Sequence, residues 1–85
     1  MSKIKVVYKK LGRHKVKKGD CVGLAHVDKN LIEIEERLLA KDKFKTLIHE
    51  LCHMAFPEYS ETKILKAERI IGNILWNEGY RKIEQ

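Results

Sequence analysis

Three residues in the second half of the chain have the types and the spacing that suit a metal ion, in the pattern His49-Glu50-x-x-His53. On a helix, His49 and His53 lie four residues apart, so both imidazoles occupy one face, one turn from each other. Two imidazoles at this spacing can bind one Zn²⁺ at about 2.0–2.1 Å each. Glu50 lies roughly 100° round the helix from His49 and roughly 60° from His53. We therefore predict that Glu50 takes a proton from a water that the ion activates, the general-base role of hydrolytic metal sites.

The segment around this motif is strongly periodic and predicts an amphipathic helix over 41–56. Its apolar positions recur at the spacing of one helical face, and they are Phe44, Leu47, Ile48, Leu51 and Ala55. Asp42 is the predicted N-cap, and Pro57 ends the helix near Phe56 because proline cannot continue it. The two histidines lie beside the apolar face. We therefore expect them at the margin of a groove that water can reach.

A second helix is predicted over 60–79, with Ser60 as its N-cap and Gly79 as its C-terminal stop. Its apolar arc comprises Ile64, Leu65, Ala67, Ile71, Ile74, Leu75 and Trp76. Two acidic residues, Glu61 and Glu68, fall within this arc, and an inward carboxylate is costly unless a positive charge compensates it. A zinc ion would provide that charge.

Either acidic residue would complete a site of two histidines and one glutamate, a recurrent ligand set of catalytic zinc with an open fourth position. The short link at 57–59 returns the second helix antiparallel or at a steep angle, so the histidines lie level with about residues 63–67. Glu61 and Glu68 flank that level, and this geometry leaves both open. The helix dipole favours an ionised carboxylate at Glu61, whereas Glu68 could instead pair with a lysine or arginine at the helix margin.

Length and composition indicate one small globular domain, 1–85. Of its 85 residues 44% are hydrophobic and one is proline, which favours a folded core over disorder. No apolar run approaches the ~18 residues of a membrane span, and the N-terminus lacks the features of a secretory signal. Cys21 and Cys52 are too few for a disulfide framework and fit a reducing compartment, so we expect a cytoplasmic protein. Cys52 is expected in the core, with a role as a thiolate ligand as the alternative.

The net positive charge is concentrated at the N-terminal end. Residues 1–18 carry eight lysines or arginines and no acidic residue, whereas the rest of the chain carries ten basic and twelve acidic residues. The basic segment could contact nucleic acid or an acidic partner. We favour lysines that guard an edge strand and a loop, because no known nucleic-acid-binding motif accompanies the basic residues.

Three segments have the composition of strands, 3–9, 22–27 and 31–35. The turn residues 28–30 between the last two predict a hairpin, and the alternation over 31–35 predicts a half-buried, edge-like strand before the first helix. Together these segments predict an α+β fold, with a small antiparallel or mixed sheet of about three strands packed on two helices. Its expected parts are a basic strand and loop (1–20), strands (21–40), the helix with the motif (41–56) and the second helix (60–79).

Several stretches carry a resemblance to a known family, and they are 23–28, 32–34, 46–53 with its H-E-x-x-H core, Pro57, Ser60-Glu61 and 75–80. They resemble the small zincin-type proteins of phages and prophages, which are described as metallopeptidases and are related in pattern to the SprT-like and ImmA-like groups. The resemblance covers about residues 20–82. It implies a minimal, gluzincin-like fold in which an edge strand beside the active-site helix can bind an extended peptide by strand addition.

The same resemblance implies roles for four residues. His49 and His53 would be zinc ligands, and Glu50 would be the catalytic base. Glu61 matches the acidic position at the start of the family's second helix and would be the third ligand. We therefore expect a zinc-dependent metallopeptidase that hydrolyses peptide bonds, in the cytoplasm of a bacterial host cell if the chain is phage-encoded.

A different function remains open at this point. The chain could be a non-catalytic, zinc-stabilised module that binds nucleic acid or a host protein through its basic N-terminal segment. A peptidase also needs a group that stabilises the oxyanion, and His26 and Tyr80 are the candidates by residue type alone.

Overall fold

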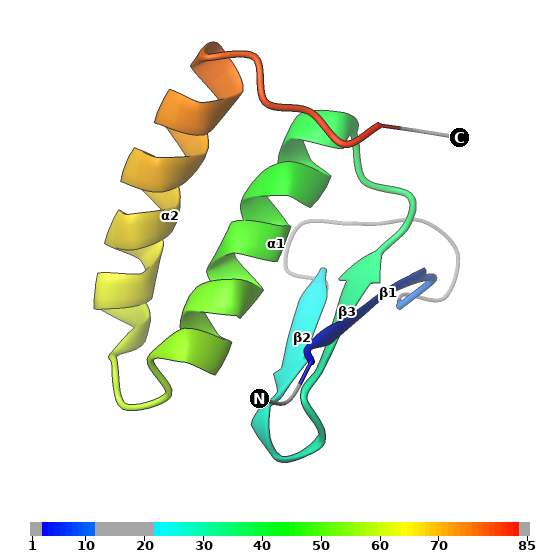
Figure 1. The fold of residues 1–85 in the computed structure, drawn as a ribbon, viewed down its shortest axis with the longest axis vertical. Helices are drawn as coiled ribbons and strands as arrows, with labels where there is room; N and C mark the ends of the chain where they lie inside the picture. Colours follow the sequence, from blue (N-terminus) through cyan, green and yellow to red (C-terminus); the bar gives the residue numbers. More distant parts are fainter. Residues whose placement is uncertain (1–2, 12–21, 84–85) are drawn as a thin grey trace.

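The computed structural model describes residues 3–11 and 22–83. It confirms an α+β fold, with a mixed sheet of three strands and two helices (Figure 1). The elements are β1 (Lys5–Lys9), β2 (Gly23–His26), a short 3-10 helix (Val27–Lys29), β3 (Leu31–Glu35), α1 (Ala40–Ala55) and α2 (Glu61–Asn77). Most of the predicted basic loop, together with Cys21, lies outside the described residues.

The strand order in the sheet is β1-β3-β2. β2 and β3 form the predicted antiparallel hairpin, and Asn30 between them adopts the left-handed conformation that asparagine tolerates, with φ 50°. β1 pairs with the other side of β3 in parallel. The prediction of an edge position for Leu31–Glu35 was therefore wrong, because local alternation does not reveal that two other segments pair with this strand. The edge strand on the side of the hairpin is β2.

Helix α1 forms the middle layer, between the sheet on one side and α2 on the other (Figure 1). Ile32 and Ile34 of β3 and Ile64 of α2 are fully buried and form the centre of the core. Gly72 allows α2 to approach α1 closely, because a Cβ at this position would lie only 3.2 Å from Lys45 Cγ.

The apolar arc predicted for α2 is covered only in part. Ile64 is fully buried, but Leu65, Ile71 and Ile74 are 43%, 43% and 58% exposed. The extensive contacts of α2 with other elements are with α1 alone. Only the strip of α2 that faces α1 is therefore covered, and the apolar residues beside that strip face outward. A helix in an outer layer buries a narrower face than one between two layers.

Glu35 is completely buried, although the alternation of its strand predicts a solvent-facing carboxylate. Arg37 compensates it in a fork-like pair, with Nε donating to Oε2 over 2.8 Å and Nη2 donating to Oε1 over 2.7 Å. The backbone N–H groups of Leu11 and Arg37 donate to the same carboxylate, each over 2.8 Å. A buried charge with this many partners is compatible with a stable core, and it ties β3 to the residues after β1.

The helix ends follow the sequence signals, with one exception. Ser60 caps α2, and its Oγ accepts from the N–H of Lys63 over 3.3 Å. Gly79 has φ 91° and closes a C-terminal motif with two backbone bonds after the last turn. Asp42 is not the N-cap of α1, because the helix begins two residues earlier with Leu39 in the cap position. No side chain caps that end, so the acidic signal at Asp42 belongs to the first turn.

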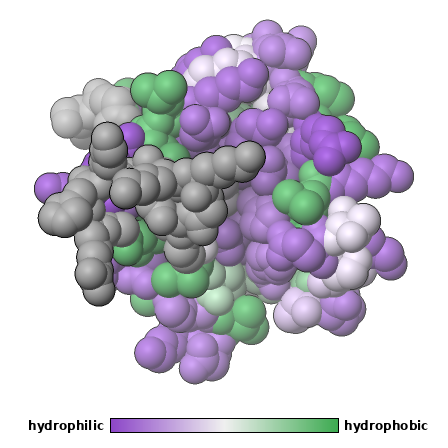
Figure 2. Space-filling view, turned by 180° about the vertical axis from the view of Figure 1, so that it is seen from behind, coloured by the Kyte–Doolittle hydropathy of each residue, from purple (hydrophilic) through white to green (hydrophobic). Residues whose placement is uncertain are grey.

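β1 is an edge strand whose described lysines are exposed, which agrees with the guarded-edge interpretation of the basic N-terminus. One of them, Lys9, forms an ion pair with Glu33 over 3.2 Å. Seen from behind, the described surface is largely hydrophilic, with hydrophobic groups scattered between the polar ones (Figure 2). Within residues 3–11 and 22–83, no helix is long and apolar enough to cross a membrane.

Candidate metal centre

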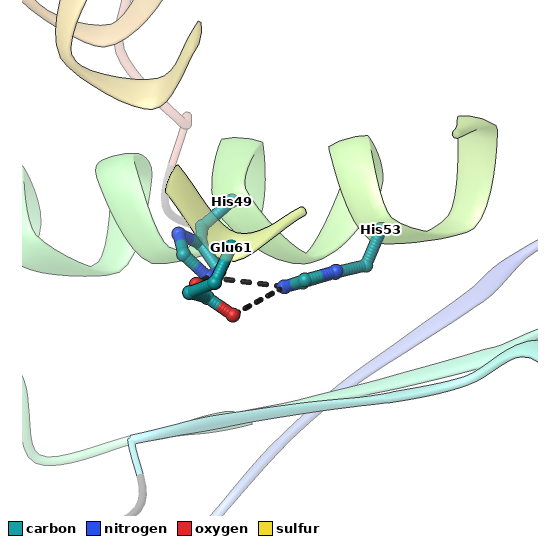
Figure 3. A group of neighbouring side chains, drawn as sticks. All are labelled: His49, His53 and Glu61. Atoms are coloured by element: carbon teal, nitrogen blue, oxygen red, sulfur yellow. Dashed lines mark hydrogen bonds and ion pairs between the residues drawn. The ribbon is translucent and has the colours of Figure 1, made fainter. Parts of the chain in front are cut away.

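His49, His53 and Glu61 point toward one another at the end of α1 that adjoins α2 (Figure 3). The four-residue spacing places both histidines on one face of α1, and Glu61 enters from the first turn of α2. The distance is 3.2 Å between His49 Nε2 and His53 Nε2. Glu61 bridges the pair, with Oε1 2.6 Å from His49 Nε2 and Oε2 3.3 Å from His53 Nε2.

This arrangement fits the requirements of zinc. Two ligand atoms bound at about 2.0–2.1 Å with tetrahedral angles lie about 3.3 Å apart, which agrees with two of the three distances between the side chains. Imidazole nitrogen and carboxylate oxygen are both ligands that Zn²⁺ accepts. The Glu61 side chain is 60% exposed and those of His49 and His53 are 15% and 27% exposed. One side of the group is therefore open to water, as a catalytic ion requires.

Glu68 has a different position from Glu61, although both were candidate ligands. Its Oε1 lies 2.9 Å from His49 Nδ1, on the side of the ring that faces away from Glu61. Lys45 Nζ lies 3.9 Å from the other carboxylate oxygen of Glu68. A carboxylate at Nδ1 keeps the proton on that nitrogen and directs the Nε2 lone pair toward the metal position. The structure thus places the two glutamates differently, with Glu61 between the two Nε2 atoms and Glu68 at Nδ1 of His49.

Glu50 is 8% exposed and lies between α1 and the sheet. Burial is the largest influence on its carboxyl group and raises the pKa, while the nearby His49 and His53 act in the opposite direction. A carboxyl group with a raised pKa releases and accepts protons nearer to neutral pH, which is the requirement for a general base that later returns the proton.

A cavity of about 440 Å³ opens beside these groups. The two histidines, Glu50 and Glu61 line it from the helices, and β2 lines it from the sheet through Gly23, Leu24 and Ala25. The absence of a side chain at Gly23 is required here. A Cβ at this position would lie 2.7 Å from Thr46 Cγ2 and 2.9 Å from Glu50 Oε2. Gly23 therefore leaves the space that the Glu50 carboxylate occupies. The spacing of residues 49–53 could not reveal this role, because Gly23 lies in a distant part of the sequence.

Neither candidate for the oxyanion lies at this cavity. His26 is on the opposite face of β2 and contacts Glu33 Oε1 over 2.9 Å, because side chains alternate along a strand. Tyr80 lines a different cavity near the C-terminal end of α2. Apart from the two histidines, no described residue that lines the metal-side cavity has a basic, hydroxyl or amide side chain that could donate a hydrogen bond to an oxyanion.

Cys52 is a free, buried thiol, as expected for a core position. Its pKa is raised by burial and by the negative charge of Glu68. Both effects oppose the thiolate that a zinc ligand would need. The group of His49, His53 and Glu61 does not include it.

Comparisons of this chain with protein families, with curated proteins and with solved structures give no match.

Proposed function

We propose that this chain is a zinc-dependent metallopeptidase that cleaves an extended peptide in the cavity between α1 and β2. The observation that carries the proposal is the position of Glu50, a buried carboxylate with a raised pKa at a cavity shared with His49, His53 and Glu61. A site that only holds a structural ion needs four closed ligands and no buried base. Three protein ligands, an open side and a base favour hydrolysis instead.

Each residue then has one task. His49, His53 and Glu61 hold the ion, and Glu68 keeps His49 in the tautomer that binds it. When bound, Zn²⁺ supplies Lewis acidity toward a water and a peptide carbonyl. Glu50 accepts the proton of the attacking water and delivers it to the leaving amine. Its burial keeps the carboxylate in place and strengthens its basicity.

β2 provides a place for the substrate backbone. The Glu35 N–H group donates to the Val22 carbonyl over 2.9 Å, so these two residues form a hydrogen-bonded pair of the antiparallel β2–β3 ladder. Such pairs alternate along the ladder with pairs that exchange no hydrogen bond. By alternation, the backbone groups of Ala25 point away from β3, toward the outer edge of β2. Ala25 also lines the metal-side cavity. An extended peptide that pairs with this edge would pass its carbonyl groups in front of the histidines.

The test is cleavage of a mixed peptide library by the zinc-loaded chain, with products identified by mass spectrometry. We expect cleavage that a chelator stops and that added Zn²⁺ restores, and none by His49→Ala. The alternative is the zinc-stabilised binding module, which would retain zinc, cut no peptide and bind nucleic acid with a steep salt dependence. That set of results would contradict the peptidase proposal. The free Cys52 thiol fits a reducing compartment for either function, and we propose the cytoplasm, that of a bacterial host cell if the chain is phage-encoded.

Gly23→Ala is expected to reduce peptide hydrolysis by about 10- to 100-fold, because the new Cβ displaces the Glu50 carboxylate by a fraction of an ångström or more. Zinc content should remain that of the parent, since the nearest neighbours of the new Cβ belong to Thr46 and Glu50, which are outside the proposed ligand group. The measurements are hydrolysis rate and metal content. Gly72→Ala is the matched control, because its Cβ meets only flexible atoms of Lys45 and Ile48 at 3.2 Å or more. Equal losses of hydrolysis in the two variants would contradict the role of Gly23.

A further inference from the structure

We propose that the chain has a second ligand site, separate from the metal centre, that binds a small organic anion with an aromatic body. The site is a cavity of about 800 Å³ at the other end of α1. It is larger than the metal-side cavity, at about 440 Å³, and the two share no lining residue. Both volumes lie in the range of small-molecule sites, about 300–1,000 Å³.

Aromatic side chains are concentrated at this cavity. The chain contains six aromatic residues, three Tyr, two Phe and one Trp. Four of them, Tyr8, Phe44, Trp76 and Tyr80, line the cavity. They come from β1, α1, α2 and the segment after α2, and the Phe44 and Trp76 rings are in contact at 5.7 Å between centroids. Rings gathered from four separate segments give the cavity an aromatic, apolar lining that suits an aromatic ligand body.

The same cavity has an excess of positive charge. Lys43, Arg81 and Lys82 line it, against the single carboxylate of Glu36. Within the described part of the chain, none of these three cations is in an ion pair, so each can bind an incoming anion. Arg37 also lines the cavity, but its charge is balanced by the buried Glu35. The lining therefore favours a negative group on the ligand.

The C-terminal segment holds two of these cations in place. In Figure 1 it passes from the end of α2 across the N-terminal end of α1 toward the sheet. The Arg81 guanidinium lies 3.3 Å above the Trp76 ring and its Nη1 donates to the carbonyls of Trp76 and Tyr80 over 2.8 and 3.0 Å. Lys82 Nζ lies 3.9 Å above the Tyr8 ring. Cations fixed on aromatic faces lose little conformational freedom when an anion binds, and Arg81 has further N–H donors for it.

A small ligand fits these observations better than a nucleic acid strand. Tyr8 faces the cavity. Lys5 and Lys9 lie three residues before it and one residue after it in β1, so their side chains point to the opposite face of the sheet. The basic residues of β1 therefore do not extend the positive lining into a track that a phosphate backbone could follow.

The experiment is a titration of the zinc-loaded full chain with 2-naphthoate, followed by NMR at the indole N–H of Trp76. This residue is the only tryptophan, so its signal reports on this cavity alone. We expect saturable shifts with a Kd of about 1 mM or below, as for a ligand of this size. The uncharged analogue 2-naphthalenemethanol should bind at least about tenfold more weakly. The double variant Lys43→Gln, Lys82→Gln should lose the same factor for naphthoate and none for the alcohol.

The matched control is Lys66→Gln, an exposed lysine of α2 that lines neither cavity and should leave the shifts unchanged. Equal binding of acid and alcohol, or unchanged naphthoate binding in the double variant, would overturn the anionic part of the proposal. No shift of Trp76 with naphthoate would overturn it entirely, as would tight, salt-sensitive shifts with oligothymidylate in place of naphthoate. Zinc removal by Glu61→Ala should leave naphthoate binding intact, because the two cavities are separate.

Discussion

Glu61→Ala is expected to abolish stoichiometric zinc binding, whereas Glu68→Ala is expected to weaken it by about 10- to 100-fold. The difference follows from the contacts of the two carboxylates. Glu61 lies 2.6 and 3.3 Å from the two Nε2 atoms, where a metal would be bound. Glu68 contacts only Nδ1 of His49, at 2.9 Å, so its removal leaves all three ligands present and one of them poorly oriented.

The measurement is zinc content by mass spectrometry after purification, with affinity from competition against a chromophoric chelator. Glu58→Ala is the control, since Glu58 is an exposed acidic residue in the same link between the helices and is outside the proposed ligand group. Retention of full affinity by Glu61→Ala, together with loss in Glu68→Ala, would reverse the assignment. A wild-type protein that binds no zinc would contradict the metal centre itself.

Glu50→Gln is expected to reduce peptide hydrolysis by about 10²- to 10⁴-fold, the usual contribution of a general base. Zinc binding should be retained, because Glu50 is outside the group of three ligands. The amide has nearly the shape of the carboxyl group but cannot accept the proton of the water. Equal turnover by wild type and variant would exclude the proposed role of Glu50.

The same variant is expected to be more stable than the wild type when both are free of metal at neutral pH. Burial raises the pKa of Glu50 above the value of 4.5 for an exposed group, so the ionised form is less favourable in the folded state. For a carboxyl group with a raised pKa, the resulting cost is absent below about pH 4.5 and grows as the pH rises through the folded pKa. Urea unfolding of both proteins at about pH 7 and about pH 4 measures it. A stability difference that shrinks toward neutral pH would contradict the sign.

Local sequence signals predicted those parts of the fold that depend on neighbouring residues. Ser60 and Gly79 have the predicted roles at the ends of α2 because a cap is formed within one helical turn. The hairpin between β2 and β3 follows in the same way from its turn residues. The failure at Asp42 is also local, since the N-cap position lies three residues earlier, at Leu39.

Contacts between distant segments could not be predicted in this way. The sequence places Glu35 in an alternating strand, and its complete burial depends on Arg37 and on the Leu11 N–H group from beyond β1. The central position of β3 depends on the parallel pairing of β1 on its far side. The exposure of Ile71 and Ile74 depends on α2 packing against one helix only.

The candidate site also combines features that local sequence predicts with features that depend on contacts between distant segments. By itself the sequence determined the His49, Glu50 and His53 motif, because a spacing of four residues on a helix brings two imidazoles together whatever surrounds them. Glu61 and Glu68 are seven residues apart on one helical face, so their sequence positions could not separate a metal-ligand position from a partner of His49 Nδ1. The tertiary structure places the two carboxylates at different nitrogens of His49, because the packing of α2 on α1 sets the level at which each carboxylate meets the histidines. It also placed Gly23 against Glu50 and brought the edge of β2 to the cavity.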